Sequence, residues 1–258
     1  MLRPRIIPSL LIRDKGLVKS TQFKDYRYLG DPMNAVRIFN EKEVDELAVF
    51  DIEATVLGQE PNYKLIQHLA EECRMPLCYG GGIKTVEQAQ RIFSLGVEKI
   101  AVSSVAIFHP NIVTELAQKV GSQSVVVVLD VKKKFLGGYE VYTHNGKKGT
   151  GKNPFDVIKK MQDLGAGEIV VNNIDADGMM KGYDLNLLEK SKSATTLPFT
   201  ALGGAGQLED VGLLIEKFGI IGAAAGSLFV YKGKLKGVLI NYPNSSEKDE
   251  LIKKHFKI

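Results

Sequence analysis

Carboxylates stand directly after three apolar runs of the sequence. Asp51 follows "ELAVF", Asp130 follows "SVVVVL", and Asp175 and Asp177 lie in "NNIDADG". A carboxylate at the end of a buried strand either caps the next loop or faces a pocket as an acid or base. For Asp51 and Asp175 both roles stay open. Asp130 ends the most apolar run of the chain, so we predict that it is catalytic.

Glycines and hydroxyls follow four other apolar runs in a pattern suited to anions. Their backbone N–H groups and the helix N-termini beside them can hold a phosphate. Because the pattern occurs twice, we predict a ligand with two phosphate groups. Lys19, in "GLVK", could reach one of them, although a loop lysine is usually only solvated. The two sets are Gly82, Ser103 and Ser104, and then Gly203, Gly204, Gly226 and Ser227.

Eight apolar runs alternate with amphipathic stretches and would position these residues. The stretches "VEQAQRIFSLG", "NIVTELAQKVG" and "PFDVIKKMQDLGAG" end near glycine, as helices commonly do. The run "VVVVLD" is continuously apolar, which indicates a parallel sheet covered on both faces. Eight such units predict a (β/α)8 TIM barrel, with a doubly wound open sheet as the alternative. The runs are "RIIPSLLI", "ELAVFD", "MPLCYG", "KIAVSS", "SVVVVLD", "EIVVNN", "PFTAL" and "IIGAAAG".

The chain also contains an internal repeat. "DP" at Asp31, followed by "DELAVFD", recurs as "NP" at Asn153, followed by "GEIVVNNID". "GGGIKTVEQA" recurs as "GGAGQLEDV", and "VSSVAIF" recurs as "AAGSLFV". The matched order and spacing predict two half-barrels, of about residues 1–120 and 121–240. We therefore expect one barrel domain over residues 1–258, with a C-terminal tail at about 241–258.

Composition limits the classes of function. The formal net charge is +4 and the lysines are spread along the chain, which argues against a nucleic-acid partner. Cys73 and Cys78 are too few for a disulfide framework, so we expect inert thiols and no metal or other cofactor. The start "MLRPRIIPSLLIRDK" is too soon interrupted by charge for a signal peptide or membrane span. We expect a cytoplasmic protein without a membrane partner.

Seven motifs together resemble one enzyme family. They are "RIIPSL…DKGLVKSTQF…GDP", "DELAVFDIEAT", "GGGIKTVEQA", "GSQSVVVVLDVK", "GKKGTG", "GAGEIVVNNIDADGMMKGYD" and "TALGGAG". In order and spacing, over residues 1 to about 231, they are similar to the cyclase subunit, HisF type, of imidazole glycerol phosphate synthase. The resemblance implies a barrel that takes ammonia from a glutaminase subunit. It also implies a phosphorylated substrate and the products imidazole glycerol phosphate and an aminoimidazole carboxamide ribotide.

The resemblance also assigns roles to residues. Gly82, Ser103 and Ser104 match one phosphate site, with Ser103 in place of the usual asparagine. Gly178, Gly204, Gly226 and Ser227 match the other, and we add Lys19, Asp51, Asn172, Asp177 and Gly203 to the substrate-binding set. The ammonia gate of the family is a ring of four charges, matched here by Arg5, Glu46, Lys99 and Glu168. Taken singly, each of these four would be only a salt bridge at a strand end.

One departure from the family concerns the acid–base pair. The family has catalytic aspartates at the ends of strands 1 and 5; Asp130 matches the second, and the first falls on Leu11. Leucine cannot carry a proton, and Asp14, three residues on, is not assured of reaching the same point. A substrate-contacting threonine is Asn172 here, and a serine of the hairpin before "GKK" is Asn145.

Three functions fit this pattern. The first is the paralogous cyclase-like protein of bacterial surface-polysaccharide (O-antigen, lipopolysaccharide) gene clusters, which helps a glutaminase and a third, amidotransferase enzyme to form acetamidino sugars. The second is the cyclase of histidine biosynthesis. The third is a non-catalytic scaffold that binds the glutaminase and conducts ammonia. We favour the first over the second because half of the acid–base pair is missing, with Leu11 in place of the first aspartate. We favour it over the third because a conduit needs neither Asp130 nor two phosphate sites.

Overall fold

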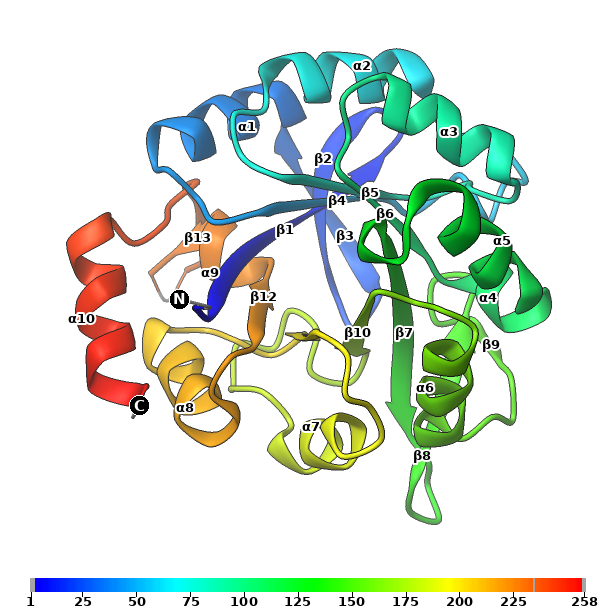
Figure 1. The fold of residues 1–258 in the computed structure, drawn as a ribbon. Coiled ribbons are helices and arrows are strands. Elements are labelled where there is room, and N and C mark those ends of the chain that lie inside the picture. Colours follow the sequence, from blue (N-terminus) through cyan, green and yellow to red (C-terminus); the bar gives the residue numbers. More distant parts are fainter. Residues whose placement is uncertain (1–2, 234, 257–258) are drawn as a thin grey trace.

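The computed structural model describes residues 3–233 and 235–256 and contains a closed barrel of parallel strands (Figure 1). Every strand of its wall corresponds to one of the apolar runs, so the (β/α)8 prediction is confirmed. The wall consists of β1 (Arg5–Arg13), β4 (Leu47–Asp51), β5 (Leu77–Gly80), β6 (Lys99–Val102), β7 (Val125–Lys133), β10 (Glu168–Asn173), β11 (Phe199–Leu202) and β12 (Gly222–Ala225).

Pairing between the first and last strands closes the barrel. β1 runs parallel to β12, with Arg5 opposite Gly222, and parallel to β4 on its other side. In the middle of the chain, β7 pairs with β10 and places Asp130 opposite Asn172. Closure excludes the open doubly wound sheet. It also brings the carboxyl ends of all eight strands to one mouth and their starts to the other.

Helices cover the outside of the barrel between successive strands (Figure 1). Three predicted helices are present, and each is followed within two residues by a glycine of positive φ, namely Gly96, Gly121 or Gly165. A one-turn 3-10 helix spans Ser122–Ser124. The helices are α1 (Pro32–Glu41), α2 (Tyr63–Glu72), α3 (Val86–Ser94), α4 (Ser104–Phe108), α5 (Asn111–Val120), α6 (Pro154–Asp163), α7 (Leu185–Lys192), α8 (Leu208–Phe218), α9 (Ser227–Val230) and α10 (Ser245–His255).

The repeated segments adopt the same local structure. In α1, the N-cap Asp31 accepts a hydrogen bond from Met33 N at 2.6 Å, and in α6 the N-cap Asn153 accepts one from Phe155 N at 2.9 Å. Proline is the first residue of both helices, where its missing N–H costs nothing. The repeated sequence segments at Asp31 and Asn153 therefore start two helices with the same kind of cap.

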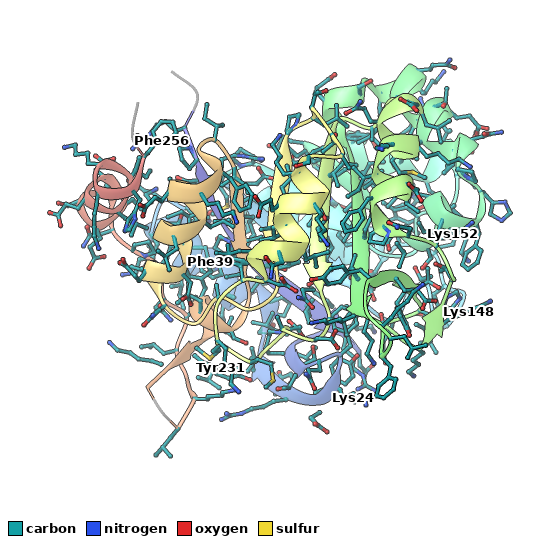
Figure 2. The ribbon with its side chains drawn as sticks, turned by 90° about the horizontal axis from the view of Figure 1, so that it is seen from below. Lys24, Phe39, Lys148, Lys152, Tyr231 and Phe256 are labelled. Atoms are coloured by element: carbon teal, nitrogen blue, oxygen red, sulfur yellow. The ribbon has the colours of Figure 1, made fainter. Side chains whose placement is uncertain are left out.

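Three hairpins extend from the mouth at the carboxyl ends of the strands. β2 (Gly16–Thr21) and β3 (Lys24–Gly30) follow β1, β8 (Tyr139–Thr143) and β9 (Lys148–Gly149) follow β7, and β13 (Tyr231–Lys232) and β14 (Gly237–Val238) follow β12. In Figure 2, one residue from each hairpin lies in the lower half of the molecule, whereas Phe256 lies at the upper end. The labelled residues are Lys24, Lys148 and Tyr231.

Residues 241–256 pack closely on the barrel. α10 lies against α8 (Figure 1). Tyr242 Oη donates a hydrogen bond to Ile6 O at 2.9 Å, and Lys248 Nζ forms an ion pair with Asp45 Oδ1 at 2.8 Å. The segment expected as a tail thus contacts β1 and the loop before β4, and it supplies the covering helix that follows β12. Among the described residues, no helix is long and apolar enough to cross a membrane.

Apolar side chains form two cores. The larger lies between the strands and the helices and includes Phe39, Tyr79 and Phe229. The smaller fills the barrel interior, with Phe50 packed against it, and four of its nine members are alanine or cysteine. These small side chains leave room for a cavity inside the barrel. The nine are Ile7, Ala48, Cys78, Ala101, Val126, Val128, Val170, Leu202 and Ala224.

We predict that Tyr242→Phe lowers the free energy of unfolding by about 1–2 kcal/mol, because Ile6 O would lose its buried donor. Urea unfolding followed by circular dichroism measures this as a lower midpoint at an unchanged m-value. Tyr28→Phe is the control, since Tyr28 is 68% exposed. An unchanged midpoint for Tyr242→Phe would show that the C-terminal segment does not help to hold the barrel together.

Candidate functional site

A pocket opens between the strand ends and the hairpins at the carboxyl mouth of the barrel. Its floor is formed by strand ends, and the β2–β3 hairpin and the β8–β9 turn contribute to its wall. Because eight strands end here, residues far apart in the sequence meet in one place. The predicted residues that line it are Lys19, Asp51, Gly82, Ser103, Ser104, Asp130, Asn172, Asp177 and Gly226, together with Leu11.

Asp130 lies at the floor of the pocket. Its Oδ1 accepts a hydrogen bond from Asn172 Nδ2 at 2.9 Å across the β7–β10 pair. Burial raises the pKa of Asp130 to about 7, an effect that the Asn172 hydrogen bond opposes and the charge of Asp177 reinforces. A carboxyl group with a pKa near neutrality can both take up and release a proton at physiological pH. Asp130 is therefore chemically suited to acid–base work.

Leu11 lines the same pocket as Asp130. It pairs with Phe50 on β4 and with Val18 on β2, so its side chain is held at the end of β1. Asp14 lies in a separate surface hollow next to Arg13 and Glu53, and its backbone N–H donates to Glu53 Oε2 at 3.1 Å. Asp14 therefore does not stand in for a carboxylate at position 11.

Asp51 and Asp175 hold loops. Asp51 Oδ1 accepts hydrogen bonds from Glu53 N and Ala54 N, both at 3.0 Å, and burial raises its pKa. Asp175 Oδ2 accepts a hydrogen bond from Lys133 N at 2.8 Å. The capping alternative thus describes both side chains, although Asp51 also lines the pocket.

Lys19 forms a buried ion pair with Asp177. Lys19 Nζ lies 2.6 Å from Asp177 Oδ1, and Ser20 Oγ donates to Asp177 Oδ2 at 2.9 Å. Lys19 is 5% exposed and Asp177 is 8% exposed. The positive charge that could meet a phosphate is therefore already neutralised by a carboxylate in this structure.

The two predicted phosphate sets differ in their surroundings. Gly82, Ser103 and Ser104 line the open pocket together. In the second set, a Cβ at Gly204 would lie 2.1 Å from Gly182 O, and one at Gly226 would lie 2.9 Å from Lys19 Cε. A side chain would therefore not fit at either glycine, although Gly226 itself lines the pocket beside Lys19. The second phosphate site stays a prediction.

Two buried oxygens in this region lack hydrogen-bond partners. They are Ser227 Oγ, in the second predicted phosphate set, and Asn172 Oδ1, beside Asp130. Buried polar atoms are nearly always paired, and either a water or a bound molecule could supply the missing partner of these two oxygens. Gly203 and Gly178 leave no room for a side chain. A Cβ at Gly203 would lie 2.7 Å from Asn173 O, and one at Gly178 would lie 2.5 Å from Ser20 O.

The four predicted gate residues meet at the opposite mouth of the barrel. Arg5 pairs with Glu46 and, at 2.7 Å, with Glu168. Lys99 Nζ lies 2.9 Å from Glu46 Oε2 and 3.0 Å from Glu168 Oε2. The charges alternate around a closed ring. Although burial raises the pKa of Glu168, Arg5 and Lys99 hold it below its ordinary value.

A small internal cavity lies between this ring and the pocket. It offers about 20 Å³ to water-sized molecules, which is enough for one such molecule. Glu46 and Glu168 of the ring line one part of it, and Phe50 and Leu202 line both this cavity and the pocket. The ring, the cavity and the pocket thus follow one another along the barrel axis.

Comparison with known proteins identifies the family. The family model described as "Histidine biosynthesis protein" matches residues 5–236. The chain belongs to this family. Within it, the chain is of the HisF type, which confirms the resemblance that its motifs indicate.

Curated relatives of the HisF type match almost the whole chain. It is 60% identical over 252 residues to "Putative imidazole glycerol phosphate synthase subunit HisF" of Leptospira borgpetersenii, covering 97% of this chain and 99% of that one. It is 49% identical over 249 residues to the hisF2 protein of Pseudomonas aeruginosa, named in the same way, covering 96% and 99%. Against the HisF subunit of Streptococcus sanguinis, identity is 37% over 231 residues, covering 90% and 92%.

Phe23, Tyr26 and His144 line the pocket but were not predicted from the sequence, and Asn145 was noted there only as the match to a hairpin serine. His144 and Asn145 lie at the β8–β9 turn with positive φ, and Asn145 Nδ2 donates to Ile52 O at 2.6 Å. Phe23 and Tyr26 enter the pocket from the β2–β3 hairpin. The Asn-Gly of "THNGKK" signals a turn, but only the fold shows that this turn reaches the pocket.

Cys73 is partly buried and Cys78 is buried, and both are free thiols. Burial raises the pKa of Cys73 to about 12 and also raises that of Cys78, so both stay protonated and unreactive at neutral pH. Over residues 3–233 and 235–256, no cluster of three or more His, Cys, Asp or Glu side chains could hold a metal ion.

We predict a pH-dependent stability change at Asp130. With a pKa of about 7 in the folded protein against an ordinary 3.8, the folded state binds the proton more tightly, so stability falls as the pH rises between these values. Asp130→Asn should therefore be more stable than the natural protein at pH 8. We expect a gain in the free energy of unfolding of about 1–2 kcal/mol, because solvent in the open pocket screens part of the effect. Near pH 4 the two should match.

Urea unfolding at both pH values measures this difference, with Asp25→Asn in exposed β3 as the control. A gain of equal size at pH 4 and pH 8 would contradict the raised pKa.

Proposed function

We propose that this HisF-type chain receives ammonia from a glutaminase at the charged ring and delivers it to a phosphorylated ligand in the opposite pocket. The contiguous order of ring, cavity and pocket carries the proposal, because Glu46 and Glu168 line the cavity and Phe50 and Leu202 are shared with the pocket. The glutaminase would dock at the mouth where the strands begin, forming a heterodimer.

The interior suits ammonia and excludes ammonium. Ala48, Cys78 and Ala224 line the cavity with small apolar surfaces. Moving an ion into such surroundings without a partner costs far more than moving a small neutral molecule. The ring is closed by its ion pairs, so a ring side chain has to shift for ammonia to enter. The side chain of Lys99 is 19% exposed and is held in the ring by the ion pairs of its Nζ, so we expect Lys99 to be the residue that shifts.

We propose further that the role is in forming acetamidino sugars for bacterial surface polysaccharide, in the cytoplasm, together with a third, amidotransferase enzyme. Leu11 at the pocket supports this role, since Asp130 then lacks an acidic partner at the end of β1. The printed names of the Leptospira and Pseudomonas relatives, which leave the synthase activity open, are consistent with a paralogue.

Histidine biosynthesis is the second candidate. The 37% identity to the HisF subunit of Streptococcus sanguinis favours it, as do Asp130 and the first phosphate set, in which Ser103 is the one departure from the family. A scaffold that merely conducts ammonia is the third. The raised pKa of Asp130 weighs against a pure conduit, because a conduit needs no carboxyl group poised near neutrality.

We predict that the natural protein does not form imidazole glycerol phosphate at a useful rate, even from ammonium salt, because positioned proton transfer contributes roughly 10²- to 10⁴-fold. Leu11→Asp should raise the rate by a factor in this range. Leu11→Asn is the matched control, since it has the shape of aspartate but cannot exchange a proton. The measurement is cyclisation with ammonium chloride; robust activity of the natural protein would return the assignment to histidine biosynthesis.

We also predict that Lys99→Met uncouples glutamine hydrolysis from the use of the released ammonia. Formation of the amidated sugar from glutamine should fall at least fivefold, because the ring is broken. Formation of the same product from ammonium salt should stay within twofold. Lys217→Met is the control, as Lys217 forms an exposed ion pair with Glu189 at 2.8 Å on the outer helices. An equal loss with both nitrogen sources would indicate damage to the fold and argue against a gate.

A further inference from the structure

A groove continues from the pocket past the first predicted phosphate set. Five residues line both spaces, among them Ser104 and His144, so the pocket and the groove meet there. The groove is bounded by α4, the first turns of α5 and the β8–β9 hairpin. α4 and β9 lie close together in Figure 1. The lining of the groove includes Lys84, Ser104, Phe108, Ile112, His144 and Lys148.

The sizes of the two spaces favour a ligand that occupies both. The pocket has a volume of about 130 Å³, whereas the groove has a volume of about 950 Å³. Sites that hold drug-sized ligands usually measure about 300–1,000 Å³. The pocket alone holds a phosphate and a small group, so a larger ligand has to continue into the groove.

Two lysines of the groove carry positive charge that no carboxylate neutralises. Lys84 Nζ donates a hydrogen bond to Gly58 O at 3.0 Å, and Lys148 Nζ lies 5.1 Å from the centre of the Phe108 ring. Among the described residues, neither lysine forms an ion pair. Glu115 is the acidic residue among those described in the lining, so the lysines outnumber it and the groove attracts an anion.

Apolar side chains form much of the remaining groove surface. Phe108 is 44% exposed, and its ring lies edge-on to the ring of His144, with the ring centres 6.1 Å apart. Pro110 and Ile112 continue the apolar surface along the start of α5. Cationic groups beside an apolar, aromatic surface suit a molecule that joins anionic groups to a ring, because each part of that molecule finds a matching contact.

We propose that the groove binds the far half of a diphosphate-linked ligand, an inference that rests on the phosphorylated ligand of the proposed function. One phosphate lies at Ser104, which lines both spaces, and the next lies in the groove beside Lys84 and Lys148. A ring beyond the second phosphate, such as the base of a nucleoside diphosphate, packs on Phe108. A phosphate monoester would end at Ser104 and leave the lysines of the groove without an anion.

Isothermal titration calorimetry with inorganic phosphate, inorganic pyrophosphate and adenosine diphosphate tests the groove. We expect the natural protein to bind pyrophosphate more tightly than phosphate. Lys148→Met should lower the ratio of the two affinities by roughly fivefold, since it removes a charged donor and keeps an apolar stem over Phe108. Lys147→Met is the matched control, because it removes the same charge one residue away and Lys147 lines neither space. It should leave the ratio unchanged.

A second pair of variants tests the ring contact. Phe108→Ala should lower the ratio of adenosine diphosphate affinity to pyrophosphate affinity by roughly threefold or more, because the base loses its apolar contact. Phe135→Ala is the control, since Phe135 is 102% exposed and lines neither space. Equal ratios for the natural protein and Phe108→Ala would overturn the placement of the ring in the groove.

Two outcomes separate the groove from the proposed function. If phosphate binds and pyrophosphate binds no more tightly, or if Lys148→Met and Lys147→Met change the ratio equally, the groove is not a diphosphate site and the proposed function stands. If neither phosphate nor pyrophosphate binds, the phosphorylated ligand of the proposed function fails, and the groove inference fails with it.

Discussion

The ring of Arg5, Glu46, Lys99 and Glu168 is the interaction on which the account of this molecule depends. Each carboxylate contacts both cations, and Thr200 Oγ1 also donates to Glu168 Oε1 at 2.6 Å. Glu46 and Glu168 are 5% and 4% exposed, so removing one partner would leave a buried charge without compensation, which is strongly destabilising. The ring exists only because the barrel closes and brings the starts of four strands together. The four charges are therefore paired with one another only when the sheet is closed.

The opposite mouth gathers side chains from several strand ends and hairpins. Gly82 and Gly226 both line the pocket, and the buried ion pair of Lys19 and Asp177 lies beside Gly226. Leu11, near the end of β1, lines the same pocket as Asp130. One pocket therefore combines a carboxyl group, a lysine that is already paired and an apolar side chain.

Much of this could be predicted from the sequence because it depends on local pattern. Continuous apolar runs predicted every strand of the barrel, and Asp130 followed from its place after the most apolar run. The close approach of Lys19 to Gly226 could not be predicted, since it depends on how the β2–β3 hairpin folds back over the barrel. The entry of His144 into the pocket, and the packing of Tyr242 on Ile6, are also tertiary contacts without a sequence signal.

We propose above that ammonia passes through the barrel without mixing with solvent. The most direct test supplies glutamine labelled with ¹⁵N at the amide, together with an excess of unlabelled ammonium in the medium, to the complex of this chain with its glutaminase and the sugar amidotransferase. Mass spectrometry of the amidated sugar gives the nitrogen source. We predict that the amidated sugar keeps the ¹⁵N of glutamine. Dilution of the label to the ratio in the medium would contradict it.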